Sequence, residues 1–207
     1  MMLYKPELAT KIHAMLMAGM GEMDVLSTCC KHDPEHTVLT EIINVCPGCD
    51  KRFANSYANT TTISLWELLA NSETFVFPDY QGRSMTILDA CPTREKPHIH
   101  EAIRTLIGKM NIRLVEPEKS GIRSTCCGDS FYPQLPVTSV NDLMKKRTAE
   151  MPLDEVIVYC VSCIQSVAIG GKNPRYLPDL LMGLDTMPKV LKTDVWHLLL
   201  DEYIEKH

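Results

Sequence analysis

The feature that most constrains this chain is the arrangement of its nine cysteines, all of which fall into two groups. The later group has three parts: Cys91, the Cys126-Cys127-Gly128 turn and the Cys160-Val161-Ser162-Cys163 turn. The earlier group has two parts, Cys29-Cys30 and Cys46-Pro47-Gly48-Cys49. Free core cysteines are usually scattered singly, whereas adjacent pairs and Cys-x-x-Cys turns are typical of metal and redox sites. We therefore expect separate loops of the chain to bring thiols together around metal.

The composition is ordinary for a globular protein. At 207 residues, with 45% hydrophobic and 23% charged residues, the chain can form one large domain or two small ones. Its net charge of −5 and its longest basic run, Lys145-Lys146-Arg147, predict no nucleic-acid binding. No apolar run is long enough to span a membrane, and residues 1–7 lack the pattern of a signal peptide. These features predict a cytoplasmic protein, in which nine thiols favour metal over disulfides.

Hydrophobic periodicity predicts alternating helices and strands, and therefore an α/β fold. The cysteines follow predicted strands, at the sheet edge where open α/β folds usually bind ligands. Ser139 is expected to cap a helix. The expected helices cover residues 7–20, 46–58, 65–69, 98–110, 140–151 and 194–205. The expected strands cover residues 41–45, 74–77, 85–88, 112–116 and 155–159.

An internal repeat divides the chain into two related halves, residues 1–79 and 80–207. Three pairs of segments correspond in the same order: 26–30 with 123–127, 41–46 with 155–160, and 65–69 with 177–181. The first half is abridged, because it has no counterpart of Cys91 and has Lys31 in place of Gly128. We expect the halves to face each other across a pseudo-twofold axis and to pack as one unit.

The number of thiols separates two kinds of metal site. Four cysteines in the first half match a tetrahedral zinc ion, whereas five in the second half exceed that number. Adjacent side chains such as Cys126 and Cys127 point to opposite sides of an extended backbone, so they suit a cluster of several irons better than one ion. Gly128 would let the backbone approach such a cluster. A strained disulfide between Cys126 and Cys127 is the alternative for this pair.

The order Cys, Cys-Cys-Gly, Cys-x-x-Cys resembles the cysteine-rich CCG domain found in the catalytic subunit of heterodisulfide reductase and in iron–sulfur subunits of lactate- and glycolate-oxidising complexes. The resemblance covers most of the chain, since that family usually carries two CCG motifs in tandem. It implies a non-cubane [4Fe-4S] cluster in the second half. The implied ligands of this cluster are Cys91, Cys126, Cys127, Cys160 and Cys163.

The same resemblance assigns a partial motif to the first half. Departures from the family pattern are the missing first cysteine, Lys31, and Pro92 where the family often has His. We expect the first half to bind zinc or a second iron–sulfur cluster, unlike the cluster of the second half, unless a partner, His32 or His36 supplies another ligand. The implied metal ligands of the first half are Cys29, Cys30, Cys46 and Cys49.

Two functions are compatible with these motifs. The first is an iron–sulfur redox protein that passes electrons to a disulfide or another acceptor. The sequence contains no Gly-x-Gly-x-x-Gly fingerprint, so we expect the electrons to come from a redox protein or a flavoprotein subunit. The second is a non-enzymatic module in which zinc or iron holds the fold or docks a partner.

Overall fold

The computed structural model describes residues 4–20, 40–56, 60–189 and 192–206. The expected ligands Cys29 and Cys30 and the two histidines His32 and His36 lie outside the described residues. Helices and parallel strands alternate along the chain, which confirms the predicted α/β class.

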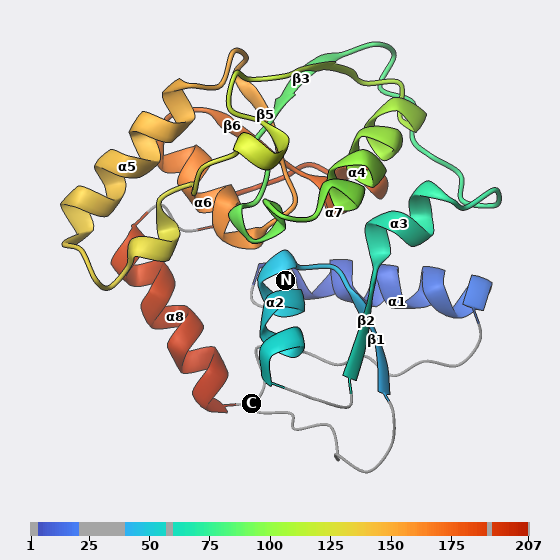
Figure 1. Cartoon of the computed structure of the whole chain (residues 1–207), viewed down its shortest axis with the longest axis horizontal. Helices are drawn as coiled ribbons and strands as arrows, with labels where there is room; N and C mark the ends of the chain where they lie inside the picture. Colours follow the sequence, from blue (N-terminus) through green and yellow to red (C-terminus); the bar gives the residue numbers. More distant parts are fainter. Residues whose placement is uncertain (1–3, 21–39, 57–59, 190–191, 207) are drawn as a thin grey trace.

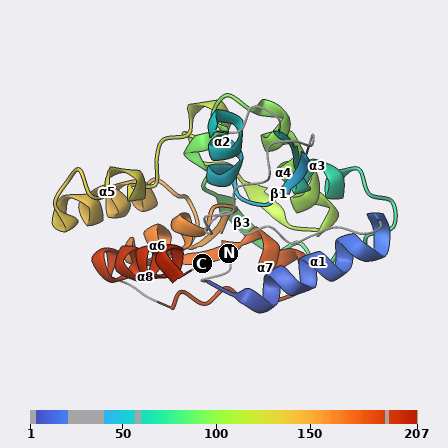
Figure 2. The same ribbon diagram turned by 90° about the horizontal axis from the view of Figure 1, so that it is seen from below.

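The larger sheet has four parallel strands in the order β4-β3-β5-β6. The pairing of β3 with β5 places Thr86 opposite Val156 and Ile87 opposite Ile157. Helix α4 lies on one side of this sheet, and α6 and α7 lie on the other (Figure 2). The strands are β3 (Ser84–Ile87), β4 (Arg113–Val115), β5 (Glu155–Val158) and β6 (Asn173–Tyr176). The helices around them are α4 (Pro97–Lys109), α5 (Val137–Ala149), α6 (Val161–Ile169) and α7 (Leu177–Leu181).

The first half contributes a second, two-stranded parallel sheet, which lies below the larger sheet in the view of Figure 1. Its chain order, strand, helix, strand, helix, is the order that β5, α6, β6 and α7 follow in the second half. The pseudo-twofold relation between the halves stays a prediction. The elements of this part are β1 (Thr40–Asn44), α2 (Pro47–Ser56), β2 (Thr60–Ser64) and α3 (Leu65–Ala70).

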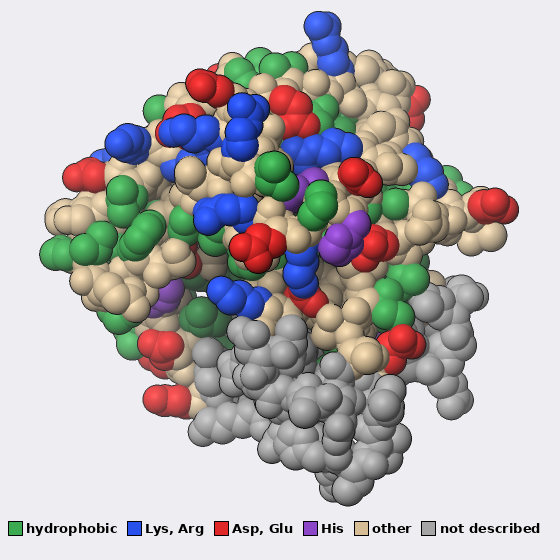
Figure 3. Space-filling model, viewed as in Figure 1, with side chains coloured by type: hydrophobic (Ala, Val, Ile, Leu, Met, Phe, Trp, Pro, Cys, Tyr) green, Lys and Arg blue, Asp and Glu red, His purple; other side chains and the backbone are tan. Residues whose placement is uncertain are grey.

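Two terminal helices complete the fold: α1 (Pro6–Met20) and α8 (Thr193–Lys206). Three short 3-10 turns lie in the connecting loops: Cys91–Thr93, Gly121–Arg123 and Asp129–Phe131. None of the helices in the described ranges is long and apolar enough to cross a membrane. The face in Figure 3 carries Lys and Arg side chains interspersed with Asp and Glu.

The strongest sequence patterns form the centre of the core. In β5, Val156, Ile157 and Val158 are fully buried, as a strand covered by helices on both sides requires. In α4, the predicted apolar side, which includes Ile103 and Leu106, is also fully buried against the sheet. Both elements form where the sequence predicted them.

One predicted strand is wrong, and the structure has a strand elsewhere. Residues 74–77 are not in a strand; the rings of Phe75 and Phe77 pack edge to face at 4.7 Å, and Val76 is 87% exposed. The strand of this region is β2, which pairs along its whole length with β1. Aromatic and β-branched residues suit strands in general, but only a partner strand satisfies the backbone, and no described strand pairs with residues 74–77.

The predicted cap of α5 is also wrong. This helix begins at Val137 with Pro136 at the cap position, so Ser139 lies within its first turn. Helices α6 and α7 and strand β6 were not predicted. In β6, Pro174 interrupts the usual strand pattern, and this edge position tolerates proline because only one side of the strand is paired.

The N-terminal segment is held by the second half of the chain. The buried Asp179 carboxylate of α7 accepts hydrogen bonds from the Tyr4 hydroxyl at 2.8 Å and from Lys5 Nζ at 2.6 Å. Tyr4 also packs edge to face on Tyr176, with ring centroids 5.6 Å apart. Leu8 is fully buried within the same core cluster as the large sheet.

We therefore predict that an isolated fragment of residues 1–79 does not fold on its own. The fragment would lack Asp179 and Tyr176 and would expose the apolar face that α1 buries, and so short a chain has little other core. Circular dichroism during thermal unfolding, without added metal, is expected to show no cooperative transition. A sharp transition in the fragment would contradict this prediction.

Candidate metal centre

The cysteine loops begin at the carboxyl ends of parallel strands. In the larger sheet, the connection from β3 leads outward to β4, whereas the connection from β5 leads outward to β6 on the opposite side. The boundary between β3 and β5 is thus a topological switch point, the place where open α/β sheets form a crevice for ligands. Cys91 follows β3 and Cys160 follows β5, so both cysteines flank this boundary.

Both Cys-x-x-Cys turns open helices. Cys160 is the cap residue of α6, with an extended backbone, and Cys163 lies in the first turn of that helix. In the first half, Cys46 follows β1 by two residues and directly precedes Pro47, the first residue of α2. The Cys46 carbonyl accepts a hydrogen bond from the Asp50 amide at 3.1 Å, as expected for the residue that starts a helix.

The seven described cysteines form one continuous series of interacting thiols. All seven are free of disulfide bonds, so no disulfide joins Cys126 to Cys127. Cys127 and Cys163 are buried, and the other five are partly buried. The interacting pairs are Cys49 with Cys46, Cys46 with Cys160, Cys160 with Cys163, Cys163 with Cys127, Cys127 with Cys126, and Cys126 with Cys91.

The contact between Cys46 and Cys160 joins the two cysteine groups of the sequence. The structure thus brings all five expected ligands of the second half together, and it adds two of the four expected from the first half. The other two, Cys29 and Cys30, lie outside the described residues. The sequence could not predict this contact, because it depends on how the small sheet packs against the large one.

Gly128 gives the turn after Cys126 and Cys127 a backbone conformation and a space that other residues disfavour. Its backbone φ of +111° is in the region that disfavours other residues, and its amide donates to Cys126 Sγ at 3.3 Å. A Cβ atom at this position would lie 2.9 Å from the Met144 side chain of α5. The glycine therefore allows α5 to approach the turn closely.

A buried carboxylate ties the three cysteine loops of the second half together. Asp89, two residues before Cys91, is fully buried and accepts two hydrogen bonds of 2.7 Å from the Arg104 guanidinium. It also accepts from the Gly121 amide at 2.6 Å and from the Tyr159 hydroxyl at 3.0 Å. These donors come from α4, from the loop before the adjacent cysteines, and from the residue before Cys160.

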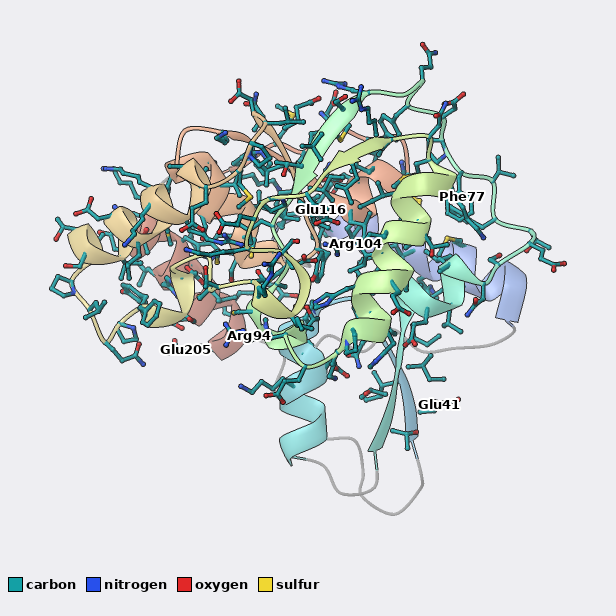
Figure 4. The ribbon with its side chains drawn as sticks, turned by 45° about the horizontal axis from the view of Figure 1, so that its top comes forward. Glu41, Phe77, Arg94, Arg104, Glu116 and Glu205 are labelled. Carbon is teal, nitrogen blue, oxygen red and sulfur yellow. The ribbon has the colours of Figure 1, made fainter. Side chains whose placement is uncertain are left out.

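Further hydrogen bonds extend this network. The Ser124 hydroxyl donates to the Asp89 carbonyl at 2.7 Å, and Glu116 accepts from Arg104 at 2.9 and 3.0 Å. Figure 4 shows Arg104 and Glu116 side by side. The buried Thr93 hydroxyl bonds to Tyr159 Oη at 2.8 Å and to His100 Nε2 at 3.0 Å. Sequence analysis missed these residues, because no motif marks them.

The charges explain why Asp89 stays ionised. Burial raises the pKa of Asp89, but the hydrogen bonds and the charge of Arg104 outweigh it and bring the pKa below its ordinary value. A carboxylate with a lowered pKa stabilises the fold above its unfolded pKa, and this stabilisation is lost as the pH falls through the folded pKa. At neutral pH the ion pair is therefore fully formed.

The crowded thiols shift one another's pKa values in opposite directions. Interactions with Cys160 and Cys49 lower the pKa of Cys46, and interactions with Cys127 and Cys91 lower the pKa of Cys126. The interaction with Cys126 raises the pKa of Cys127 to about 12. Interactions with neighbouring thiols and burial also raise the pKa of Cys91 and of Cys163. Neighbouring sulfurs therefore disfavour one another's negative charge.

These donors fit a soft metal, but not a ready-made site for one ion. Thiolate sulfur is the preferred ligand of zinc, of copper(I) and of iron–sulfur clusters. Among the described residues, no group of three or more His, Cys, Asp or Glu side chains is arranged to hold a single ion. The sulfurs come from four separate loops.

A pocket opens at the seam between the two halves. Its empty volume is about 250 Å³. Cys46, which is next to Cys49 in the thiol series, is the one cysteine among the described residues that line it. The described residues that line it are Asn44, Cys46, Pro47, Asp50, Ser64, Trp66, Thr93 and Ile99.

Comparisons with known proteins add no relatives to this description. No family model matches the chain, and no curated protein and no solved structure matches it.

We predict that replacing Asp89 by Asn lowers the free energy of unfolding by about 3 kcal/mol, because it leaves the Arg104 guanidinium without its buried partner. Denaturant unfolding measures this loss. Arg83→Ala is the control; its guanidinium is 52% exposed and pairs with Glu155, so this change is expected to cost less than about 1 kcal/mol. Equal losses in the two variants would contradict the role of Asp89.

We also predict that metal binding to the metal-free protein tightens as the pH rises. Thiols with raised pKa values, such as Cys91 and Cys163, must release protons when they bind metal. Anaerobic titration with Co²⁺, followed by its thiolate absorption, should give a higher affinity at about pH 8.5 than at about pH 6.5. An affinity that does not change with pH would rule out proton displacement from these thiols.

Proposed function

We propose that this protein is an iron–sulfur redox protein that passes electrons to a disulfide or another acceptor. The observation that carries this proposal is the single series of interacting thiols at the switch point of the sheet. Five of these thiols belong to the motif that resembles the CCG domain. The proposed ligands of a [4Fe-4S] cluster, of the non-cubane type, are Cys91, Cys126, Cys127, Cys160 and Cys163.

When bound, such a cluster supplies one-electron chemistry, and the chain supplies its position and surroundings. Asp89 orients the three loops through its hydrogen bonds, and the buried sulfurs of Cys127 and Cys163 are shielded from water. The hydroxyl of Ser130 interacts with Cys126 Sγ at 2.8 Å, and Ser166 interacts with Cys127. Hydrogen bonds to cluster sulfurs tune the reduction potential of a cluster. We expect the electrons to come from a partner redox protein or flavoprotein subunit.

A second candidate function is a structural or docking module that binds zinc. The observation in its favour is the contact of Cys46 with Cys160, which brings two Cys-x-x-Cys turns together. Four thiols of such turns are a common ligand set for structural zinc. In this alternative the metal holds the small sheet against the large one and carries no electrons.

Anaerobic purification with iron, zinc and sulfide analysis separates the two functions. A brown protein with iron and acid-labile sulfide, whose visible absorption bleaches on reduction, supports the redox protein. About eight irons per chain would indicate a second four-iron cluster in the first half. A colourless protein with stoichiometric zinc and no sulfide would contradict the redox proposal and support the structural module.

We predict that Cys127→Ser loses most of the iron and sulfide while most of the fold remains. Cys127 interacts with both Cys126 and Cys163, and serine is a poor ligand for iron that prefers thiolate. Iron and sulfide analysis and the visible spectrum of anaerobically prepared protein measure the loss. Thr125→Ser, a conservative change beside the pair, is the control and should keep its iron. An unchanged spectrum in Cys127→Ser would remove Cys127 from the ligand set.

A further inference from the structure

The turn that carries the adjacent cysteines lies within a long loop, not at the end of a strand. Cys126 and Cys127 are in the connection between β4 and α5. The Gly121 amide ties the upstream side of this loop to Asp89 at 2.6 Å. A loop adopts many conformations unless contacts hold it, so the position of the two cysteines also depends on what holds the downstream side.

The downstream contact begins at Asp129, two residues after Cys127. Asp129 is buried, and its Oδ1 lies 3.0 Å from Nε2 of His197 in α8. A carboxylate oxygen accepts hydrogen bonds, so the imidazole nitrogen is the donor. A buried carboxylate is unfavourable without a donor, so this hydrogen bond connects the turn to α8.

The ring of His197 is held on its face as well as on its edge. It stacks on the ring of Tyr132, with centroids 4.0 Å apart and an angle of 14° between the planes. The Tyr132 amide donates to the Asp129 carbonyl at 3.0 Å, so both partners of His197 belong to one short turn. The position of α8 and the shape of this turn are therefore linked.

Helix α8 also reaches the turn through α5. The Thr193 hydroxyl donates to Asn141 Oδ1 at 2.6 Å and lies 3.9 Å from Met144 Sδ. Met144 is the side chain that leaves no room for a Cβ atom at Gly128. The cysteine turn is thus bounded by α5 on one side and by the His197 contacts on the other.

The buried contacts of α8 are concentrated in its first turn. Thr193 and Trp196 are buried, whereas Leu198 is 58% exposed. Figure 1 shows this end of the helix beside the loop that leads into α5, and the other end pointing away from the larger sheet. His197 therefore lies at the end of the helix that is docked.

We propose that α8 holds the Cys126-Cys127 turn in place and that His197 is a positioning residue for the metal ligands of this turn. Because the same contacts hold the helix and the turn, docking of α8 and metal binding by the turn stabilise each other. The coupling to metal rests on the proposed metal centre, whereas the ordering of the turn by His197 does not.

The ordering of the turn is tested in the full-length protein without metal. The probe is iodoacetamide, and peptide mass spectrometry follows the labelling of Cys127 and of Cys163, which are both buried. In His197→Ala, Cys127 is expected to react about tenfold faster than in the wild type, because the turn opens locally. Cys163, in the first turn of α6, should keep its wild-type rate. Global destabilisation would speed both reactions, so an unchanged ratio of the two rates would overturn the inference.

Two further variants identify the contact that matters. His197→Gln keeps an N–H donor at about the same reach and is expected to restore much of the wild-type ratio. Leu198→Ala changes the next residue of α8, which is exposed, and should behave as the wild type. Alanine is a better helix former than histidine, so loosening in His197→Ala cannot come from weaker helix propensity. A glutamine variant that reacts as fast as the alanine variant would remove the hydrogen bond to Asp129 from the inference.

The coupling to metal is tested by anaerobic titration of the same full-length variants with Co²⁺. His197→Ala is expected to bind Co²⁺ about tenfold more weakly than the wild type, and Leu198→Ala with wild-type affinity. Bound Co²⁺ should also slow amide hydrogen exchange in residues 193–200 of the wild type, but not of His197→Ala. Equal affinities in the wild type and His197→Ala would overturn the coupling.

The results also separate this inference from the proposed function. A wild type that binds Co²⁺ while His197→Ala matches it in affinity and in labelling would overturn the role of α8 and leave the metal centre standing. A wild type that binds no Co²⁺ and contains no iron or zinc would overturn the metal centre and the coupling. The labelling ratio would then still decide whether His197 orders the turn.

Discussion

The cysteine loops depend on the buried ion pair between Asp89 and Arg104. A buried carboxylate is unfavourable unless its oxygens are fully paired, and here four donors meet it. The same hydrogen bonds connect the loop of Cys91 to the loop before Cys126 and to the residue before Cys160. The hydrogen bonds that stabilise the ion pair therefore also fix the relative placement of the three loops.

Crowding of the thiols is the second constraint. Sulfurs that interact in series cannot all be negatively charged, because like charges at close range raise one another's pKa. Bound metal cations would remove this repulsion, which agrees with the proposed metal centre. Cys46, Cys91 and Cys160 lie just after strands, whereas Cys126 and Cys127 lie in the loop between β4 and α5.

Local sequence patterns predicted most of the elements but not their partners. The continuous apolar run of β5 and the one-sided apolar pattern of α4 each form the expected element, because burial alone determines them. Residues 74–77 have the composition of a strand and β2 is rich in threonine, yet only β2 has a partner, namely β1. Neither the composition of residues 74–77 nor that of β2 shows which segment has a partner strand. The sequence analysis therefore placed this strand incorrectly.

The sequence by itself determined which residues are the candidate metal ligands. Adjacent cysteines and Cys-x-x-Cys turns at predicted strand ends are local features, and they are visible without a structure. The tertiary structure decided that Cys46 lies beside Cys160, that Asp89 joins the cysteine loops, and that Trp66 and Ile99 line the same pocket. These contacts join residues that are far apart in the chain, so they arise only when the two sheets pack together.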